Sequence, residues 1–494
     1  MVTRLSAADA VLLHTQTSTT PAHTVALTVL EASDRLSHDR LHQAVASSLP
    51  ALARFRSRLV GKPLGMGQPV WAEIDDYDPT PQIHHATVTA PGGRREFADL
   101  IAQLTTGLRD RQLWEAWSID GLAGGRWALA VKMSPALCDG GAGPASMWQR
   151  LLTTGPHDDP ANNLPTERSL GTPSLVDLVT DTMSELIENN VTGAWLLAEA
   201  VTGVLRAVRG RLRATSVPEP MPPTASMSGP VPHTVFNAPL TQRRAVAFAS
   251  IPLTDLKTVN NAFGGSITNV FLAACTLSLR AWLQRHDTVP DEPLVMQMPL
   301  APPEADPTAI GNPLPVGRIR LPVQLDDPVL ILTNLHTATE RLNTVRECDA
   351  EKGYVTVNFE RVASVIPPSA THAASQLYTR LGLAPICHGS VSYIAGKPVP
   401  AYCAGAKVVG MHIVAPLQAG CGLTIALTSH GDALDLSVCV CPDNVPAADD
   451  IANGIAESID ILVAAARKSP RGQGRSVVTK MTPNSTKRSH GRRY

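Results

Sequence analysis

Apolar residues along this chain form compact runs that predict buried strands, separated by amphipathic stretches that predict helices. In the first part of the chain, strands are predicted from Thr24 to Leu30 and from Arg126 to Met133. Amphipathic helices are predicted from Arg40 to Leu52 and from Arg95 to Leu108. The alternation of the two patterns predicts an α/β domain over residues 1–155.

The same alternation returns in a second long stretch, residues 241–467. Its predicted strands are Ala245 to Leu253, Leu294 to Leu300, Val316 to Pro322, Leu423 to Ser429 and Leu434 to Cys441. Its predicted helices are Leu253 to Phe263, Ser266 to Arg285 and Ala447 to Ala466. We therefore expect a second α/β domain, of mixed sheet and helices like the first.

Residues 156–240 differ in character and predict a helical and proline-rich crossover linker. A helix is predicted from Ser174 to Glu188, and a basic amphipathic helix from Gly193 to Arg213. The basic helix could pack on its own protein or lie on an anionic bilayer. Residues 468–494 are basic and have no acid, which predicts a disordered tail, with docking to anionic lipid as the alternative.

Length and composition narrow the class of protein. A chain of 494 residues with 44% apolar content is too long for one core and sufficient for two. The formal net charge of -1 gives no bias towards nucleic acid, and 4% aromatic residues argue against base-stacking platforms. Eight cysteines without a CxxC pair predict buried free thiols and no metal site.

The chain shows no pattern that predicts insertion into a membrane. Its first residues lack a basic region followed by an apolar core, and no run reaches about 18 uninterrupted apolar residues. We expect a cytoplasmic protein. Peripheral contact with the inner face of the membrane or with lipid droplets stays open.

The loop that follows the Arg126 to Met133 strand is the most informative stretch. It reads Ser134-Pro135-Ala136-Leu137-Cys138-Asp139-Gly140-Gly141, and a strand that stops at a proline and a glycine pair often carries chemistry. Neither Ser134 nor Pro135 titrates near neutral pH, so neither can act as a general base. By itself, an Asp-Gly pair after a strand indicates only a turn.

This loop resembles the active-site loop of the bacterial wax ester synthase/diacylglycerol acyltransferase family. That family's motif is His-His, three residues, then Asp-Gly, and its second histidine takes the proton of the acceptor hydroxyl. Here Asp139 and Gly140 match, while Ser134 and Pro135 occupy the two histidine positions. The resemblance implies that Asp139 orients the loop and that the usual base is absent.

Further blocks carry the resemblance over about residues 4–466. A Thr-Pro-x-His turn ends at His23, as in the family, and Thr268-Asn269 replace the usual Asn-Asp pair. The other matching positions are Gly311 and Asn312, which retain a Gly-Asn pair, and Ser392 and Gly396, which are kept from a turn near the C-terminus.

The resemblance implies the two-domain fold of CoA-dependent acyltransferases, with a tunnel between the domains. It also implies acyl-CoA as co-substrate, no bound cofactor, and diacylglycerol or a long-chain alcohol as acceptor. The alternative is a non-catalytic relative that binds acyl-CoA or acylglycerol, or that partners an active paralogue. Amide-forming condensation on carrier-bound substrates would need the same missing histidine.

Several other residues are candidates for the missing base or for a nucleophile. Ser134 lacks the surrounding elbow motif of serine nucleophiles, and Cys138 is expected to fill apolar space. The pair His84-His85 lacks a following Asp-Gly, which favours a strand-edge pair. The histidines that the family fold could bring near the tunnel, each more often a structural histidine, are His23, His388, His412 and His430.

Overall fold

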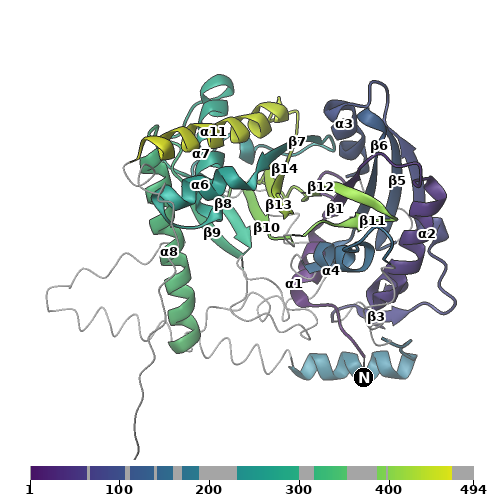
Figure 1. The fold of residues 1–494 in the computed structure, drawn as a ribbon. Helices are drawn as coiled ribbons and strands as arrows, with labels where there is room; N and C mark the ends of the chain where they lie inside the picture. Colours follow the sequence, from purple (N-terminus) through teal and green to yellow (C-terminus); the bar gives the residue numbers. More distant parts are fainter. Residues whose placement is uncertain are drawn as a thin grey trace, which may run out of the picture.

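A computed structural model describes residues 2–63, 67–105, 112–137, 142–158, 170–188, 231–299, 316–352, 386–396 and 399–469. Within these ranges the chain forms two six-stranded sheets and a small two-stranded sheet. Figure 1 shows the two large sheets side by side, each with its own helices. The described residues therefore form two α/β halves, as the alternation of strands and helices predicts.

The first sheet has the order β11-β12-β1-β6-β5-β4, in which only β4 and β5 pair in parallel. Its strands are β1 (Thr24–Leu30), β4 (Ile83–Thr87), β5 (Trp114–Leu122), β6 (Arg126–Met133), β11 (Tyr402–Cys403) and β12 (Ala406–Val414). The helices of this half are α1 (Ala7–Thr15), α2 (His38–Ser48), α3 (Arg94–Leu104) and α4 (Ala142–Leu151). The small sheet pairs β2 (Ser57–Val60) with β3 (Val70–Glu73).

The second sheet has the order β7-β14-β13-β10-β8-β9, with β10 parallel to both of its neighbours. Its strands are β7 (Ala245–Pro252), β8 (Leu294–Pro299), β9 (Val316–Leu321), β10 (Gly389–Ile394), β13 (Leu423–His430) and β14 (Ala433–Val440). Its helices are α6 (Leu253–Phe263), α7 (Ile267–His286), α8 (Pro328–Lys352) and α11 (Ala448–Lys468).

Strands β11 and β12 connect the two halves. They belong to the stretch predicted as the second domain, yet β12 pairs antiparallel with β1 of the first sheet, Val414 opposite Val25. The first sheet is thus completed by residues from far along the chain. The sequence pattern predicts no strand at these residues and gives no indication of the sheet that they join.

Strand β1 is mostly apolar because both of its faces are buried. Val25, Leu27 and Val29 belong to one buried cluster, and Ala26 and Leu30 to another on the opposite face. A strand that is buried on both faces has no solvent side to carry polar residues. The first of these clusters also contains β7 and β14 residues, among them Val246, Phe248 and Cys439, so this face of β1 packs against the second sheet.

The predicted C-terminal ends of helices α2 and α3 are wrong, because the apolar pattern continues past the residues at which the helices end. The helix predicted to run to Leu52 ends at Ser48, because Pro50 cannot continue an α-helix and the chain turns into a 3-10 segment. The helix predicted to reach Leu108 ends at Leu104, and Thr105 is its C-cap. Ser6 caps helix α1, since its side chain accepts a hydrogen bond from Asp9 N.

The linker contains a helix and the described cysteine side chains are buried, as predicted. A helix spans residues 175–188, as expected, while 193–213 and the basic tail from 470 lie outside the described residues. Six cysteines whose side chains are described are free and buried: Cys275, Cys387, Cys403, Cys421, Cys439 and Cys441. Cys387 and Cys421 bring their Sγ atoms within 2.8 Å.

Among the described helices, none reaches by itself the length and apolar character that crossing a bilayer requires. Helices α6 and α7 meet that test only when taken together, and they are bent by 101° at the break between them.

Candidate active site on the face between the two sheets

The motif loop follows strand β6 and begins at the end of the first sheet. Ser134 still continues the strand, because its N–H donates to the Leu113 carbonyl at 2.7 Å. Pro135 then opens a buried 3-10 turn that ends at Leu137. Cys138, Asp139, Gly140 and Gly141 lie outside the described residues, so the role expected of Asp139 and Gly140 stays a prediction.

Ser134 lies on the face that meets the second sheet. Side chains alternate along a strand, and Ala128 and Ala130 of β6 belong to the cluster that contains β7 residues. Lys132 and Ser134 are in phase with them. Ser134 is 2% exposed, and its hydroxyl accepts a long hydrogen bond of 3.4 Å from Ala136 N.

A buried ion pair lies beside this serine. Glu115 of β5 and Lys132 of β6 are opposite each other in the strand register, and Lys132 Nζ is 3.0 Å from Glu115 Oε2. Their side chains are 1% and 3% exposed. The ammonium group also lies 5.0 Å from the centre of the Trp117 ring. Two opposite charges are thus held away from water at the end of the sheet where the motif loop begins.

The histidine that directly precedes β1 lies at the same end of the first sheet. The last pair in the β1–β6 ladder is Thr24 with Met133, so the next position along each strand sets His23 opposite Ser134. His23 is 8% exposed, and its Nδ1 has no hydrogen-bond partner among the described residues. Burial and the charge of Lys132 lower the pKa of His23 to about 4, against an opposing effect of Glu115. The ring is therefore neutral at pH 7.

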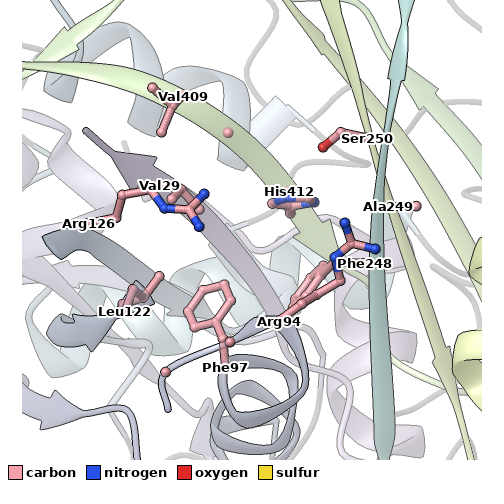
Figure 2. Close-up of a pocket in the computed structure, with 13 residues that line it drawn as sticks. Val29, Arg94, Phe97, Leu122, Arg126, Phe248, Ala249, Ser250, Val409 and His412 are labelled. Atoms are coloured by element: carbon pink, nitrogen blue, oxygen red, sulfur yellow. The ribbon is translucent and has the colours of Figure 1, made fainter. Parts of the chain in front are cut away.

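A cavity of about 260 Å³ opens between the sheets at the other end of β1. Figure 2 shows His412 inside it, with Arg94 and Arg126 on either side in this view. Burial lowers the pKa of His412, and its ring lies 4.6 Å from that of Phe248. Val29, which lines this cavity, is six residues along the chain from His23, which corresponds to about 20 Å of extended strand.

A buried carboxylate adjoins this cavity. Asp435 of β14 is 1% exposed, and it accepts hydrogen bonds from Ser250 Oγ at 2.7 Å and from Met411 N at 2.8 Å. Its Oδ2 is also 2.9 Å from His430 Nδ1. Burial alone would raise the pKa of Asp435, but His430, His412 and the Met411 N–H together hold it below its usual range. Asp435 thereby ties β12 of the first sheet to β14 and β7 of the second.

The other motif positions that the structure describes lie on or next to elements of the second half. Thr268 and Asn269 begin α7, where Asn269 Nδ2 donates to Thr339 Oγ1 of α8 at 3.0 Å. Ser392 lies in β10, and beyond it Gly396 N donates to Ser429 Oγ at 2.9 Å. A Cβ at Gly396 would come within 1.9 Å of the Ser429 carbonyl oxygen, so only glycine fits. Gly311 and Asn312 lie outside the described residues.

Other histidines have structural surroundings, as predicted. His388 is fully buried, with Nε2 2.8 Å from the Pro232 carbonyl oxygen and Nδ1 accepting from Val295 N at 2.9 Å. His84 and His85 lie on β4, at the edge of the first sheet, which confirms the prediction of a strand-edge pair. His430 is engaged with Asp435.

Comparisons with known proteins cover both halves. The family model for the wax ester synthase/diacylglycerol acyltransferase catalytic domain matches residues 5–271, and that for the C-terminal domain of the same family matches residues 310–463. Two Mycobacterium tuberculosis proteins with names of the diacylglycerol O-acyltransferase class are similar. Rv1760 is 27% identical over 492 residues, 95% of this chain and 92% of its own length. Rv0221 is 30% identical over 475 residues, which cover 94% of this chain and 96% of its own length.

Solved structures share the fold. A wax ester synthase/diacylglycerol acyltransferase from Marinobacter aquaeolei VT8 superposes with a TM-score of 0.64 at 22% identity, over 94% of this chain and 100% of that one. The starter condensation domain of rhizomide synthetase, in complex with C8-CoA, reaches a TM-score of 0.51 at 13% identity, over 95% of each chain. The predicted two-domain acyltransferase-like fold is confirmed.

Proposed function

The chain belongs to the wax ester synthase/diacylglycerol acyltransferase family, and on that premise we propose that it is an acyl-CoA-dependent O-acyltransferase. The acceptor hydroxyl of a diacylglycerol or a long-chain alcohol attacks the carbonyl carbon of the acyl thioester. The carbon–sulfur bond breaks, an ester forms, and CoA leaves as the free thiol. The product is a triacylglycerol or a wax ester.

One observation carries the proposal: strand β6, which leads into the motif loop, ends next to Ser134 on a buried face between two matched domains. Ser134 and the Glu115–Lys132 pair are sheltered from water there, which strengthens electrostatic interactions with a reacting thioester. The fold is shared with a condensation domain whose structure was determined with C8-CoA, which supports acyl-CoA as the donor.

The test is an ester-forming assay with the purified full chain. Labelled palmitoyl-CoA is mixed with dioleoylglycerol or with hexadecanol, and labelled ester is measured against a sample without acceptor. We expect ester with at least one acceptor and none without. Absence of ester with both acceptors contradicts the proposal.

The second candidate function is that of a non-catalytic relative, which binds acyl-CoA or acylglycerol or partners an active paralogue. The observation that favours it is the occupation of both histidine positions of the motif by Ser134 and Pro135. In that case the assay yields no ester, while palmitoyl-CoA still raises the melting temperature by mass action.

Among the described residues, the helix at residues 175–188 is suited to meet a lipid surface. Its acidic side is bound to the body, with Asp181 3.0 Å from Arg4 and 2.5 Å from Lys62. Glu185 pairs with the same buried Lys62. These ion pairs fix the helix so that its apolar side stays outward.

On that outward side, six apolar side chains are between 46% and 78% exposed. They are Leu175, Val176, Val179, Met183, Leu186 and Ile187. We infer that this stripe lies in the surface of a membrane or lipid droplet, where the water-insoluble acceptors proposed above reside. Burial of an apolar face at such an interface is the usual basis of peripheral attachment.

Replacing Met183 and Ile187 by glutamine is expected to weaken binding to dioleoylglycerol-containing phosphatidylcholine vesicles by roughly tenfold or more. Each buried apolar side chain contributes about 1.5–3 kcal/mol, and tenfold corresponds to about 1.4 kcal/mol. Vesicle sedimentation measures the effect. Ser184→Gln, on an exposed polar flank of the same helix, is the matched control and should bind as the parent does. Equal binding by all three proteins would exclude the stripe as the attachment surface.

A further inference from the structure

The motif has lost its two histidines, but an imidazole from a different strand lies opposite the first of the two positions. We propose that His23 is the general base of this enzyme, receiving the proton of the acceptor hydroxyl in place of the motif histidine. The proposal rests on the acyl transfer proposed above and names the residue that performs its proton transfer.

Strand register places the imidazole. Thr24 pairs with Met133, and the β6 side continues regularly through Ser134, whose N–H is bound by the neighbouring β5 segment at Leu113. Residues directly opposite each other in an antiparallel pair have Cβ atoms about 4.5–5.5 Å apart on the same face. A base at His23 is therefore displaced from the motif strand by about one strand spacing, about 4.8 Å.

The alternation along β1 gives the direction of the side chain. Val25, Leu27 and Val29 all belong to the cluster that packs against β7 and β14, and His23 is in phase with them. His23 thus lies at the end of the face between the two sheets, on the same side as Ser134. In the fold shared with the acyltransferases, this is the side that a substrate between the two halves would meet.

The free nitrogen separates His23 from His388, whose ring is fully hydrogen-bonded. His388 is fully buried and has hydrogen-bond partners at both ring nitrogens. His23 is 8% exposed, and its Nδ1 has no partner among the described residues. An unsatisfied buried polar atom is destabilising by about 1–3 kcal/mol, so its retention requires a reason. A substrate hydroxyl that donates to Nδ1 supplies one.

The charges around the ring determine its protonation state. Burial and the Lys132 ammonium keep the imidazole neutral, which is the form that accepts a proton. Once the ring has received the proton, the Glu115 carboxylate stabilises the imidazolium, since it favours the charged form of His23. Lys132 and Glu115, from β6 and β5, are the charged groups that act on His23 among the described residues.

In this reaction His23 takes up one proton and then gives it back. As the acceptor oxygen attacks the thioester carbonyl carbon, its proton passes to His23 Nδ1. The carbon–sulfur bond then breaks, and the departing CoA sulfur takes the proton back from the ring. One ester and one CoA thiol are formed, and His23 returns to the neutral state.

The test compares His23→Gln in two backgrounds of the full chain. In the parent, this change should lower kcat by about 10²- to 10⁴-fold and leave the KM for palmitoyl-CoA within a few-fold, because only proton transfer is lost. In a Ser134→His/Pro135→His background, which restores the motif histidines, the same change should cost less than tenfold. His85→Gln, an exposed histidine on edge strand β4, should leave kcat unchanged.

The pH dependence of kcat/KM is a second test, because a histidine with only a structural role would not affect it. In the parent, kcat/KM should stay level down to about pH 5, since the pKa of His23 is about 4. In the His23→Gln/Ser134→His/Pro135→His protein, the acidic limb should move towards the ordinary histidine value of about 6.5.

Equal losses from His23→Gln in both backgrounds would mean a structural role and would overturn the assignment. Unchanged kcat in the parent would overturn it as well, while leaving the proposed acyl transfer intact. Absence of ester from the parent itself would instead overturn the proposed function, and the assignment with it. Melting temperatures within a few degrees of the parent show that each variant is folded.

Discussion

Replacing Glu115 by leucine is expected to lower the free energy of unfolding by about 3–5 kcal/mol. The change leaves the Lys132 ammonium, which is 3% exposed, without the carboxylate that lies 3.0 Å away. A buried charge without its partner loses hydration and gains no compensating Coulomb energy. Urea denaturation followed by tryptophan fluorescence measures the effect, since Trp114 and Trp117 flank Glu115 in β5.

The double change Glu115→Leu/Lys132→Leu is the matched control for this prediction. It removes both charges and fills their space with apolar side chains, which is often neutral or stabilising. The double variant should therefore regain most of the stability that the single variant loses. If the double variant is as unstable as the sum of the two single changes, the pair does not act as a coupled unit.

The second large effect concerns Asp435, whose replacement by alanine should also lower the free energy of unfolding by about 3–5 kcal/mol at pH 7. The change removes the acceptor for Ser250 Oγ and for Met411 N, and it leaves that buried N–H without a partner. Because Met411 belongs to β12 and Ser250 to β7, the loss weakens the connection between the two sheets. Asp432→Ala, in the exposed turn before β14, should change stability by less than about 0.5 kcal/mol.

The contribution of Asp435 should disappear in acid. Its pKa is lowered in the folded protein, so the ionised carboxylate stabilises the fold above the unfolded value of about 3.9. That stability is lost as the pH falls through the lower folded pKa. The difference between the parent and Asp435→Ala, measured by urea denaturation, should therefore be full at pH 7 and much smaller at pH 2. An equal difference at both pH values would show that the carboxylate charge is not responsible.

The strands were predicted well from the sequence where a mostly apolar run is bounded on both sides by turn residues. Strands β1 and β6 begin and end where the pattern predicts, because turn residues flank both runs. The position of β12 could not be predicted in this way. Its residues are apolar and β-rich, as those of either sheet are, and only packing against β1 determines that it joins the first sheet.

The candidate site was predicted only in part. The loop after β6 was identified from Ser134 and Pro135, and the absence of a base there follows from residue type alone. The proximity of His23 depends on the pairing of β1 with β6, which no local pattern encodes. One signal was available: His23 directly precedes an apolar strand and is in phase with its Val25 and Leu27.

The Asp435 cluster was missed altogether. Its signal is an aspartate in the middle of a run that is otherwise apolar, Ala433-Leu434-Asp435-Leu436. A carboxylate at such a position is buried and needs hydrogen-bond donors. Which donors it finds depends on the neighbouring strands, β7 and β12, and these are assembled only in the folded chain.

The central claim is that this chain transfers acyl groups although both motif histidines are absent. The most direct test follows free CoA thiol and labelled ester together in a single turnover, with the full chain in excess over palmitoyl-CoA. We predict one CoA thiol released for each ester formed, and neither product without an acceptor alcohol. Palmitoyl-CoA that binds but yields neither product, or CoA released without ester, would contradict the account.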